Sequence, residues 1–398
     1  MHPHDASRAP DAAVLAIWLV RALLHRTQGG APALSRPVVR LRSAAACRDT
    51  GVETRVLARI RECLDVDARW TTRGERSFTW IGNRLSQKIA VRLPSPIAAE
   101  AVTPVRIATT VANDVRASEH DVIAYLARLN WYAVGSAYVF DPAARTIELV
   151  AGSHVSVSRE RDHCNDQADY AVLQLAQAER EADRIAGALG ARVAERDHTA
   201  RRARRISAAP LEVVRTRFLP DGTRPSGFRD ASRELSLAKL NLDGCCAGVT
   251  RPDGTLSIHA PFGERETIVI RCQPNVRHPW LGAGMVMFTT IPWLADAATL
   301  ARTASELQRA QLESSSASAM LGAWGTGALD GRQCVAFARF VPNAMYRADV
   351  LDDAVREEVK RAAWLDRYYF PGLDPRSVWQ IWAAMCEPVA RAAGAMVS

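Results

Sequence analysis

The chain has 398 residues, of which 48% are hydrophobic and 24% charged, and its 51 basic and 43 acidic residues give a net charge of +8. This composition excludes a largely disordered chain, and the length favours two domains with appendages over one small core. The modest positive excess does not indicate the dense basic surface of a nucleic-acid-binding domain. The eight cysteines form no CxxC pair, which argues against a zinc site or a disulfide framework and is typical of reduced thiols in a cytosol.

The first 50 residues contain one apolar segment, AAVLAIWLVRALL at residues 12–24. It is too short to cross a bilayer and carries Arg21 in its middle, so no membrane span is predicted. The residues before it are not cationic, which argues against a secretion signal. We expect a helix that packs on the protein or on a partner, followed by a loose connection rich in Gly, Pro, Ser and Arg up to residue 50.

A first module is predicted between residues 51 and 190. Helical and alternating apolar spacings define its elements. In chain order these are a helix at 52–66, strands at 77–83, 87–94 and 105–112, a helix at 119–130, strands at 133–141 and 145–157, and a helix from about 166 to 189. Ser118 is the expected N-cap of the second helix, and Gly190 is placed to end the last one.

A charged segment, ARVAERDHTARRARRIS, opens the predicted linker at residues 191–228. We interpret it as a solvated connection. Two alternatives remain open, a docking surface for an acidic partner and a nucleic-acid contact, because charged runs of one sign often serve as interaction segments. The arginines that either role requires are Arg201, Arg202, Arg204 and Arg205.

A repeated pentapeptide indicates a duplication. LARLN at residues 126–130 recurs as LAKLN at 237–241, and each is followed by a strand, a turn with Asp and Pro, and a second strand. We therefore predict a second, enlarged module at residues 229–398. The duplication predicts equivalent buried leucines and equivalent asparagine caps at helix ends: Leu126 and Leu237, Leu129 and Leu240, and Asn130 and Asn241.

The enlarged module is predicted to continue with strands at 266–272 and 284–291, a helix at 292–313, a hairpin at 321–343, and helices at 348–367 and 376–394. In the last helix Trp379, Trp382 and Cys386 share one face, and we expect them to dock the tail onto the second module.

The helix end LARLN, the strands GSAYVFDP and TIELVAG, and the apolar seam of the helix after Asp166 resemble the type III secretion effector chaperones and their YbjN-like relatives. The resemblance rests on the element order α-βββ-α-ββ-α and covers about a third of the chain well. It implies an α+β fold of two tandem chaperone-like modules, each an antiparallel sheet with helices on one face, plus helical N- and C-terminal extensions. It also implies a bacterial, cytoplasmic, protein-binding chain, either a monomer with pseudo-dimeric modules or a homodimer.

No common catalytic signature is present: the sequence contains no GxSxG, P-loop, HExxH or kinase motif. GAWGTG has glycines spaced as in a phosphate loop but lacks the Lys-Ser/Thr ending, so it indicates a hairpin turn or a tight packing site. No metal or cofactor is expected. One alternative is an enzyme with a diverged site at His163, Cys164 and Asp166, which requires a reactive Cys164 thiolate.

The leading hypothesis is therefore a non-enzymatic, chaperone- or adaptor-like protein that engages a polypeptide partner through its sheet faces. Aromatic side chains are favoured anchors at protein interfaces. The candidate contact residues are Trp80, Tyr132, Tyr138 and Phe140.

Overall fold

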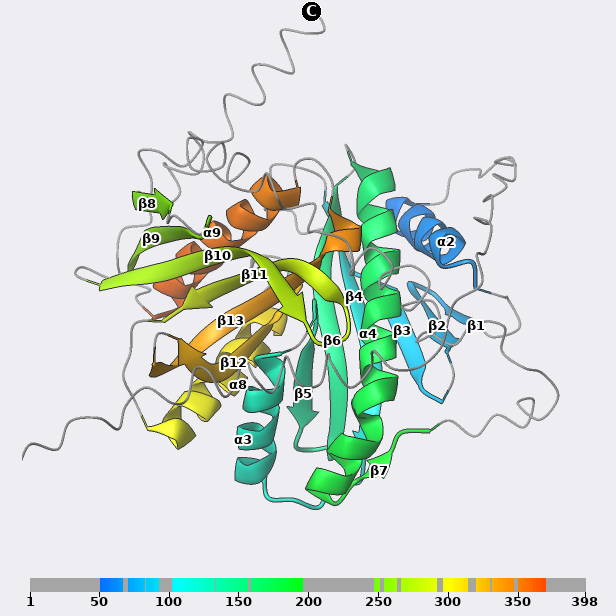
Figure 1. The fold of residues 1–398 in the computed structure, drawn as a ribbon. Helices are drawn as coiled ribbons and strands as arrows, with labels where there is room; N and C mark the ends of the chain where they lie inside the picture. The colour runs from blue at the N-terminus through cyan, green and yellow to red at the C-terminus, as the bar shows by residue number, and fades with distance from the viewer. Residues whose placement is uncertain are drawn as a thin grey trace, which may run out of the picture.

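The computed structural model describes residues 51–66, 71–82, 84–92, 102–132, 134–156, 159–195, 247–250, 254–262, 266–291, 296–313, 320–329, 331–346 and 350–369. Within these ranges the chain forms five α-helices and two antiparallel sheets, which confirms the predicted α+β class (Figure 1). None of these helices is long and apolar enough to cross a membrane.

Sheet A belongs to the first half of the chain and has the strand order β1-β2-β3-β4-β6-β5, with β7 paired to β4. Its strands are β1 (Thr71–Gly74), β2 (Ser77–Ile81), β3 (Ser86–Val91), β4 (Val102–Asn113), β5 (Ala137–Asp141), β6 (Thr146–Ser156) and β7 (Arg192–Val193). Because β7 joins this sheet, the first half extends beyond the predicted boundary at residue 190.

Two helices, α2 (Val52–Leu64) and α4 (Glu160–Leu189), cover one face of sheet A (Figure 1). The alternating burial of side chains along β4 identifies the face that these helices cover. Val105, Ile107 and Val111 are buried on it, while Arg106 and Ala108 point to the other face and are half-exposed. The helix α4 ends at Gly190, whose φ of 59° is the left-handed conformation predicted there.

A buried polar network fixes α4 on sheet A. The Gln87 amide on β3 donates to the Ala171 carbonyl and to Gln174 Oε1 on α4, both at 2.9 Å, and to Thr109 Oγ1 on β4 at 3.3 Å. The Trp80 indole donates to Gln87 Oε1 at 2.9 Å. Since buried polar groups are costly unless they are paired, this network favours one register of α4 on the sheet.

Sheet B belongs to the second half and has the strand order β12-β13-β11-β10-β9-β8. Its strands are β8 (Ala247–Thr250), β9 (Leu256–Phe262), β10 (Glu266–His278), β11 (Gly282–Thr290), β12 (Ala323–Leu329) and β13 (Arg332–Pro342). The helix α9 (Val350–Tyr369) packs on β9, β10 and β11, while α8 (Ala297–Glu313) packs on β12 and β13. A short 3-10 helix, η4 (Asn343–Met345), follows β13.

The two halves interlock through one helix from each half. The helix α3 (Glu119–Asn130) of the first half packs on β12, and α8 of the second half packs on β5 (Figure 1). Trp131 stacks on Phe288 with ring centroids 5.0 Å apart, and a Cβ atom at Gly327 would meet the Trp131 ring. The glycines of GAWGTG therefore admit α3 onto β12, which confirms the packing-site interpretation of this motif.

Further contacts join the halves on the side of β6. Gly152 and Met320 exchange two backbone hydrogen bonds, at 3.1 and 2.6 Å, and Arg159 forms an ion pair with Asp353 at 2.8 Å. The buried apolar residues of both halves form one continuous cluster. The described residues therefore share one core.

The predicted register of the duplication is wrong. The hairpin β8–β9 lies at the far edge of sheet B and pairs with β10, the next strand in the chain. The hairpin β5–β6 follows α3, and β6 pairs with β4, which precedes that helix. The two hairpins thus have different connections, so they are not equivalent. The LAKLN segment, with Leu237, Leu240 and Asn241, lies outside the described residues.

The predicted role of Asn130 is also wrong. The residue that ends α3 is Trp131, whose φ of −58° is right-handed. Asn130 is buried instead, donating its amide to the Tyr138 carbonyl at 3.0 Å and accepting the Tyr138 N–H at 2.7 Å. Its side chain thus pairs with β5 as a neighbouring strand would. Leu126 is buried as predicted, whereas Leu129 is only partly buried.

Candidate interaction surface

The helix-free face of sheet A is the main candidate for a functional surface. Two cross-strand rows lie on it, Thr79–Lys88–Ala108 and Ser77–Ala90–Arg106. Lys88 is exposed and the other five residues are half-exposed. Antiparallel sheets commonly keep one face in solvent in this way.

The second half covers this face only over β5 and β6. Val150 and Ala137, which are cross-strand partners, are fully buried, and Gly152 pairs with Met320. His154 on β6 lies near Glu357 and Lys360 of α9, and burial lowers the pKa of its imidazole. In the described ranges, the side chains on the part of the face over β2, β3 and β4 are mostly exposed or half-exposed. We call this part the basic face and define it by Thr79, Lys88, Ala90, Arg92, Arg106 and Ala108.

Cations dominate these strands. Among the described residues from 71 to 113, six are basic (Arg73, Arg76, Arg84, Lys88, Arg92 and Arg106) and one, Glu75, is acidic. Arg106 is partly neutralised by Glu148 on β6 at 3.3 Å. Lys88 and Arg92 are both exposed, so they contribute most to the positive potential of the basic face.

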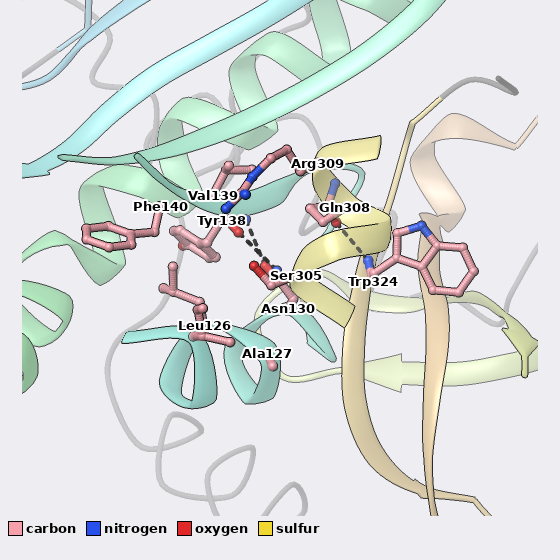
Figure 2. A pocket seen from close by; sticks show the side chains of 11 residues that line it. Leu126, Ala127, Asn130, Tyr138, Val139, Phe140, Ser305, Gln308, Arg309 and Trp324 are labelled. Atoms are coloured by element: carbon pink, nitrogen blue, oxygen red, sulfur yellow. Dashed lines mark hydrogen bonds between the residues drawn. The ribbon is translucent and has the colours of Figure 1, made fainter. Parts of the chain in front are cut away.

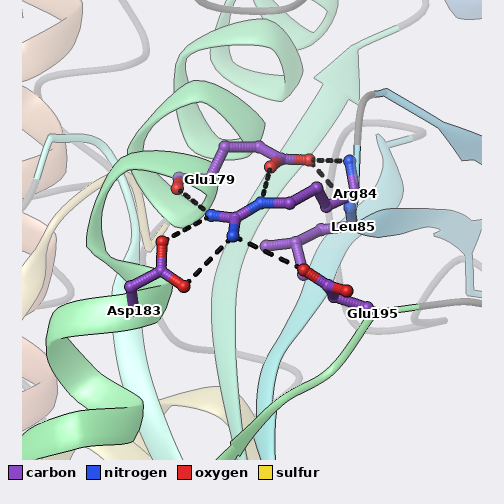
Figure 3. Close-up of polar contacts among 5 residues, drawn as sticks. All are labelled: Arg84, Leu85, Glu179, Asp183 and Glu195. Atoms are coloured by element: carbon purple, nitrogen blue, oxygen red, sulfur yellow. Dashed lines mark hydrogen bonds and ion pairs between the residues drawn. The ribbon is translucent and has the colours of Figure 1, made fainter.

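Arg84, by contrast, is a structural clamp (Figure 3). The buried Glu179 carboxylate on α4 accepts the backbone N–H groups of Arg84 and Leu85, both at 2.7 Å, and the Arg84 guanidinium at 3.3 Å. Asp183 and Glu195 complete the cluster. The hydrogen bond from Arg84 lowers the pKa of Asp183. The cluster fixes the β2–β3 turn on α4 and so holds β3 and its lysine in place.

One pocket lies between α3, β5, α8 and β12, where the two halves meet (Figure 2). Its polar lining includes Asn130 and Gln308, and both are used structurally. The Asn130 side chain accepts the Tyr138 backbone N–H, and Gln308 Oε1 accepts the Trp324 backbone N–H at 2.8 Å. The space inside the pocket is too small for a metabolite. It is therefore a packing defect of the interface between the halves.

Three of the four predicted partner-binding residues are core residues. The side chains of Trp80, Tyr138 and Phe140 are buried on the side of sheet A that faces α4. They point to this side because side chains alternate along each strand, and these three fall in line with the apolar residues that α4 covers. A partner cannot reach these side chains in the folded state, so the prediction is wrong for them. Tyr132 is 45% exposed, in the turn after α3.

The predicted Cys/His site lacks the required chemistry. Cys164 is fully buried, and burial raises the pKa of its thiol to about 12. His163 accepts the Ser156 backbone N–H through Nδ1 at 3.1 Å, as a structural residue does. The thiolate that the alternative hypothesis needs is therefore not favoured. In the described ranges no group of three or more His, Cys, Asp or Glu residues is placed to hold a metal ion.

The proposed arginine contacts at Arg201, Arg202, Arg204 and Arg205 lie outside the described residues. The nearest described arginine, Arg192, pairs with Asp114. The basic face was not predicted from the sequence. The pattern that indicates it is the alternation of Lys88, Ala90 and Arg92 with the buried Ile89 and Val91 along one strand.

The chain matches no protein-family model, no curated protein and no solved structure.

Proposed function

We propose that the protein is a non-enzymatic binding protein, and that the basic face holds an extended acidic stretch of a polypeptide partner. The observation that carries this proposal is a sheet face that neither the helices nor the second half cover within the described residues, with an excess of exposed cations. Its short side chains, Thr79, Ala90 and Ala108, let a backbone approach closely. Lys88 and Arg92 supply ionic partners for Asp or Glu side chains.

One feature favours an acidic polypeptide over a nucleic acid. The residues that define the basic face include no aromatic side chain on which bases could stack. The N-terminal part of the chain is a poor occupant for the basic face, because residues 1–50 carry seven arginines against three aspartates.

We also propose that the two halves are diverged copies of one chaperone-like module. The orders β1-β2-β3-β4-β6-β5 and β8-β9-β10-β11-β13-β12 are the same, with α3 and α8 before the last two strands and α4 and α9 after them. Equivalent elements touch reciprocally, α3 on β12 and α8 on β5. Such a chain would be a monomer with the internal symmetry of a dimer. This element order is also the support for the type III secretion chaperone-like and YbjN-like assignment.

A cytoplasmic location is part of the proposal. The four cysteines in the described ranges, Cys63, Cys164, Cys272 and Cys334, form no disulfide bond, as in proteins of a reducing compartment.

Affinity capture from the native host tests the proposed function. The baits are the wild type, the charge reversal Lys88→Glu/Arg92→Glu, and a control, Arg128→Glu/Arg302→Glu, which makes the same charge change at exposed sites on α3 and α8. We expect a protein with an acidic segment that the wild type and the control retain and the Lys88/Arg92 variant loses. Equal capture by all three baits would contradict the proposal.

A further inference from the structure

An aromatic cluster at the C-terminal end of α9 connects the core to the surface. Trp364 stacks on Tyr368 with centroids 5.4 Å apart, Tyr368 meets Tyr369 edge-on at 5.1 Å, and Tyr369 meets Phe262 of β9 at 5.9 Å. Phe262 is fully buried, whereas Tyr368 is 45% exposed. In the described ranges Tyr368 and Tyr132 are the two exposed large hydrophobic residues, and Tyr368 is the one whose ring belongs to a larger aromatic cluster.

The sequence directly after α9 carries a matching apolar stripe. After Tyr369 the chain reads FPGLDPRSVWQIWAAMCEPVARAAGAMVS, a further 29 residues. Pro371 and Gly372 favour a turn, and Ser377 is a suitable N-cap for a new helix. In a helix beginning there, Trp379, Trp382 and Cys386 share one face, and Pro388 marks its end.

We propose that residues 377–387 of the same chain form a short helix that packs on this aromatic cluster, with Trp379 and Trp382 covering Tyr368 and Trp364. Residues 370–376 are enough for the reversal, since seven residues span at most about 23 Å when extended. A tether this short gives an effective concentration on the order of millimolar, which favours this occupant over any partner in solution.

The chemistry of the two surfaces agrees. Residues 377–386 contain no charged side chain and two tryptophans. Aromatic pairs gain more than their buried area alone provides when they stack or meet edge-on.

Disulfide trapping in the full-length chain tests the contact. The pair Tyr368→Cys/Trp379→Cys is oxidised mildly and its bridges are mapped by mass spectrometry. The matched control is Tyr132→Cys/Trp379→Cys, because Tyr132 has the same 45% exposure. We expect an intrachain 368–379 bridge at several times the yield of the control bridge. Equal yields would overturn the proposal, and so would a 368–379 bridge found only between two chains, which would mean that a second copy covers the cluster.

Hydrogen exchange provides a second measurement that leaves α9 unaltered. The variant Trp379→Ser/Trp382→Ser is compared with Gln380→Ser/Ala384→Ser, which changes the opposite side of the same segment. We expect the amides of the last two turns of α9 to exchange at least about tenfold faster in the tryptophan variant, and to stay unchanged in the control. Unchanged exchange in the tryptophan variant would overturn the proposal.

Discussion

Gly325 lies where the backbone of α3 from one half rests on β12 of the other, so its replacement by alanine probes how the halves are joined. A Cβ atom there would lie 2.7 Å from the Trp131 backbone nitrogen, 2.8 Å from the Ala127 carbonyl oxygen and 3.1 Å from the Asn130 carbonyl carbon. These are backbone atoms of one helix end, so they cannot move away singly. The whole helix or the strand must shift.

Overpacking of this kind costs about 1–3 kcal/mol. The φ of Gly325 is not in the left-handed region, so alanine also gains about 0.4–1 kcal/mol by restricting the unfolded chain. Because the added Cβ would meet three backbone atoms at once, the upper part of the overpacking cost, about 2–3 kcal/mol, applies. For Gly325→Ala we therefore expect a net loss of about 1–2.6 kcal/mol in the free energy of unfolding.

Urea unfolding followed by circular dichroism measures this loss. The matched control is Gly187→Ala in α4, where an added Cβ meets no atom within 4 Å. Alanine in a helix is better than glycine by about 1 kcal/mol, so the control is expected to be more stable than the wild type. A Gly325→Ala protein as stable as the wild type would refute the close packing of α3 on β12.

Three further predictions concern the first half. Leu126→Ala is expected to lower the free energy of unfolding by about 2–5 kcal/mol in urea titrations, and Leu129→Ala by less, because Leu126 is 4% exposed and Leu129 is only partly buried. Cys164 is expected to resist iodoacetamide at pH 8.5 until the protein is unfolded, since its thiol pKa is raised to about 12; rapid labelling of the native protein, detected by mass spectrometry, would contradict the burial argument. The lowered pKa of Asp183 adds stability above the unfolded-state value of about 3.9 that is lost as the pH falls through the native value, so between pH 6 and pH 3 the wild type should lose more stability than Arg84→Met. Equal losses in the two proteins would mean that the Arg84 contact does not stabilise the carboxylate.

Local patterns in the sequence predicted most elements of the first half. The Ser118 cap, the Gly190 stop and the alternation of residues 87–91 all depend on near neighbours, and the structure has a helix start, a helix end and a strand at these places. The strand β1 was missed because Thr71–Gly74 is short and its side chains are mostly exposed, so it has no apolar alternation.

Pairing between distant segments was not predictable in the same way. LAxLN suggested an equivalence between β5–β6 and β8–β9, but strand connections depend on contacts that five residues do not encode. The side chain of Asn130 binds Tyr138 across a turn, where its position suggested a helix cap. Trp80 and Phe140 were wrongly predicted to be exposed contact residues for a related reason. The sequence around an aromatic residue in a strand looks the same whether a helix or solvent covers its side chain.

Direct binding of a defined peptide tests the central claim, that the basic face holds an acidic polypeptide segment. A fluorescein-labelled peptide of alternating Glu and Ser is titrated with protein by fluorescence anisotropy, alongside a Gln and Ser peptide of the same length, at increasing salt. We predict binding of the acidic peptide alone, with an affinity that falls as salt rises. Because reversing two contact charges replaces attraction by repulsion, Lys88→Glu/Arg92→Glu should bind at least about tenfold more weakly, and Arg128→Glu/Arg302→Glu should bind as the wild type does. No binding of the acidic peptide to the wild type, or equal affinities for the wild type and the Lys88/Arg92 variant, would contradict the claim.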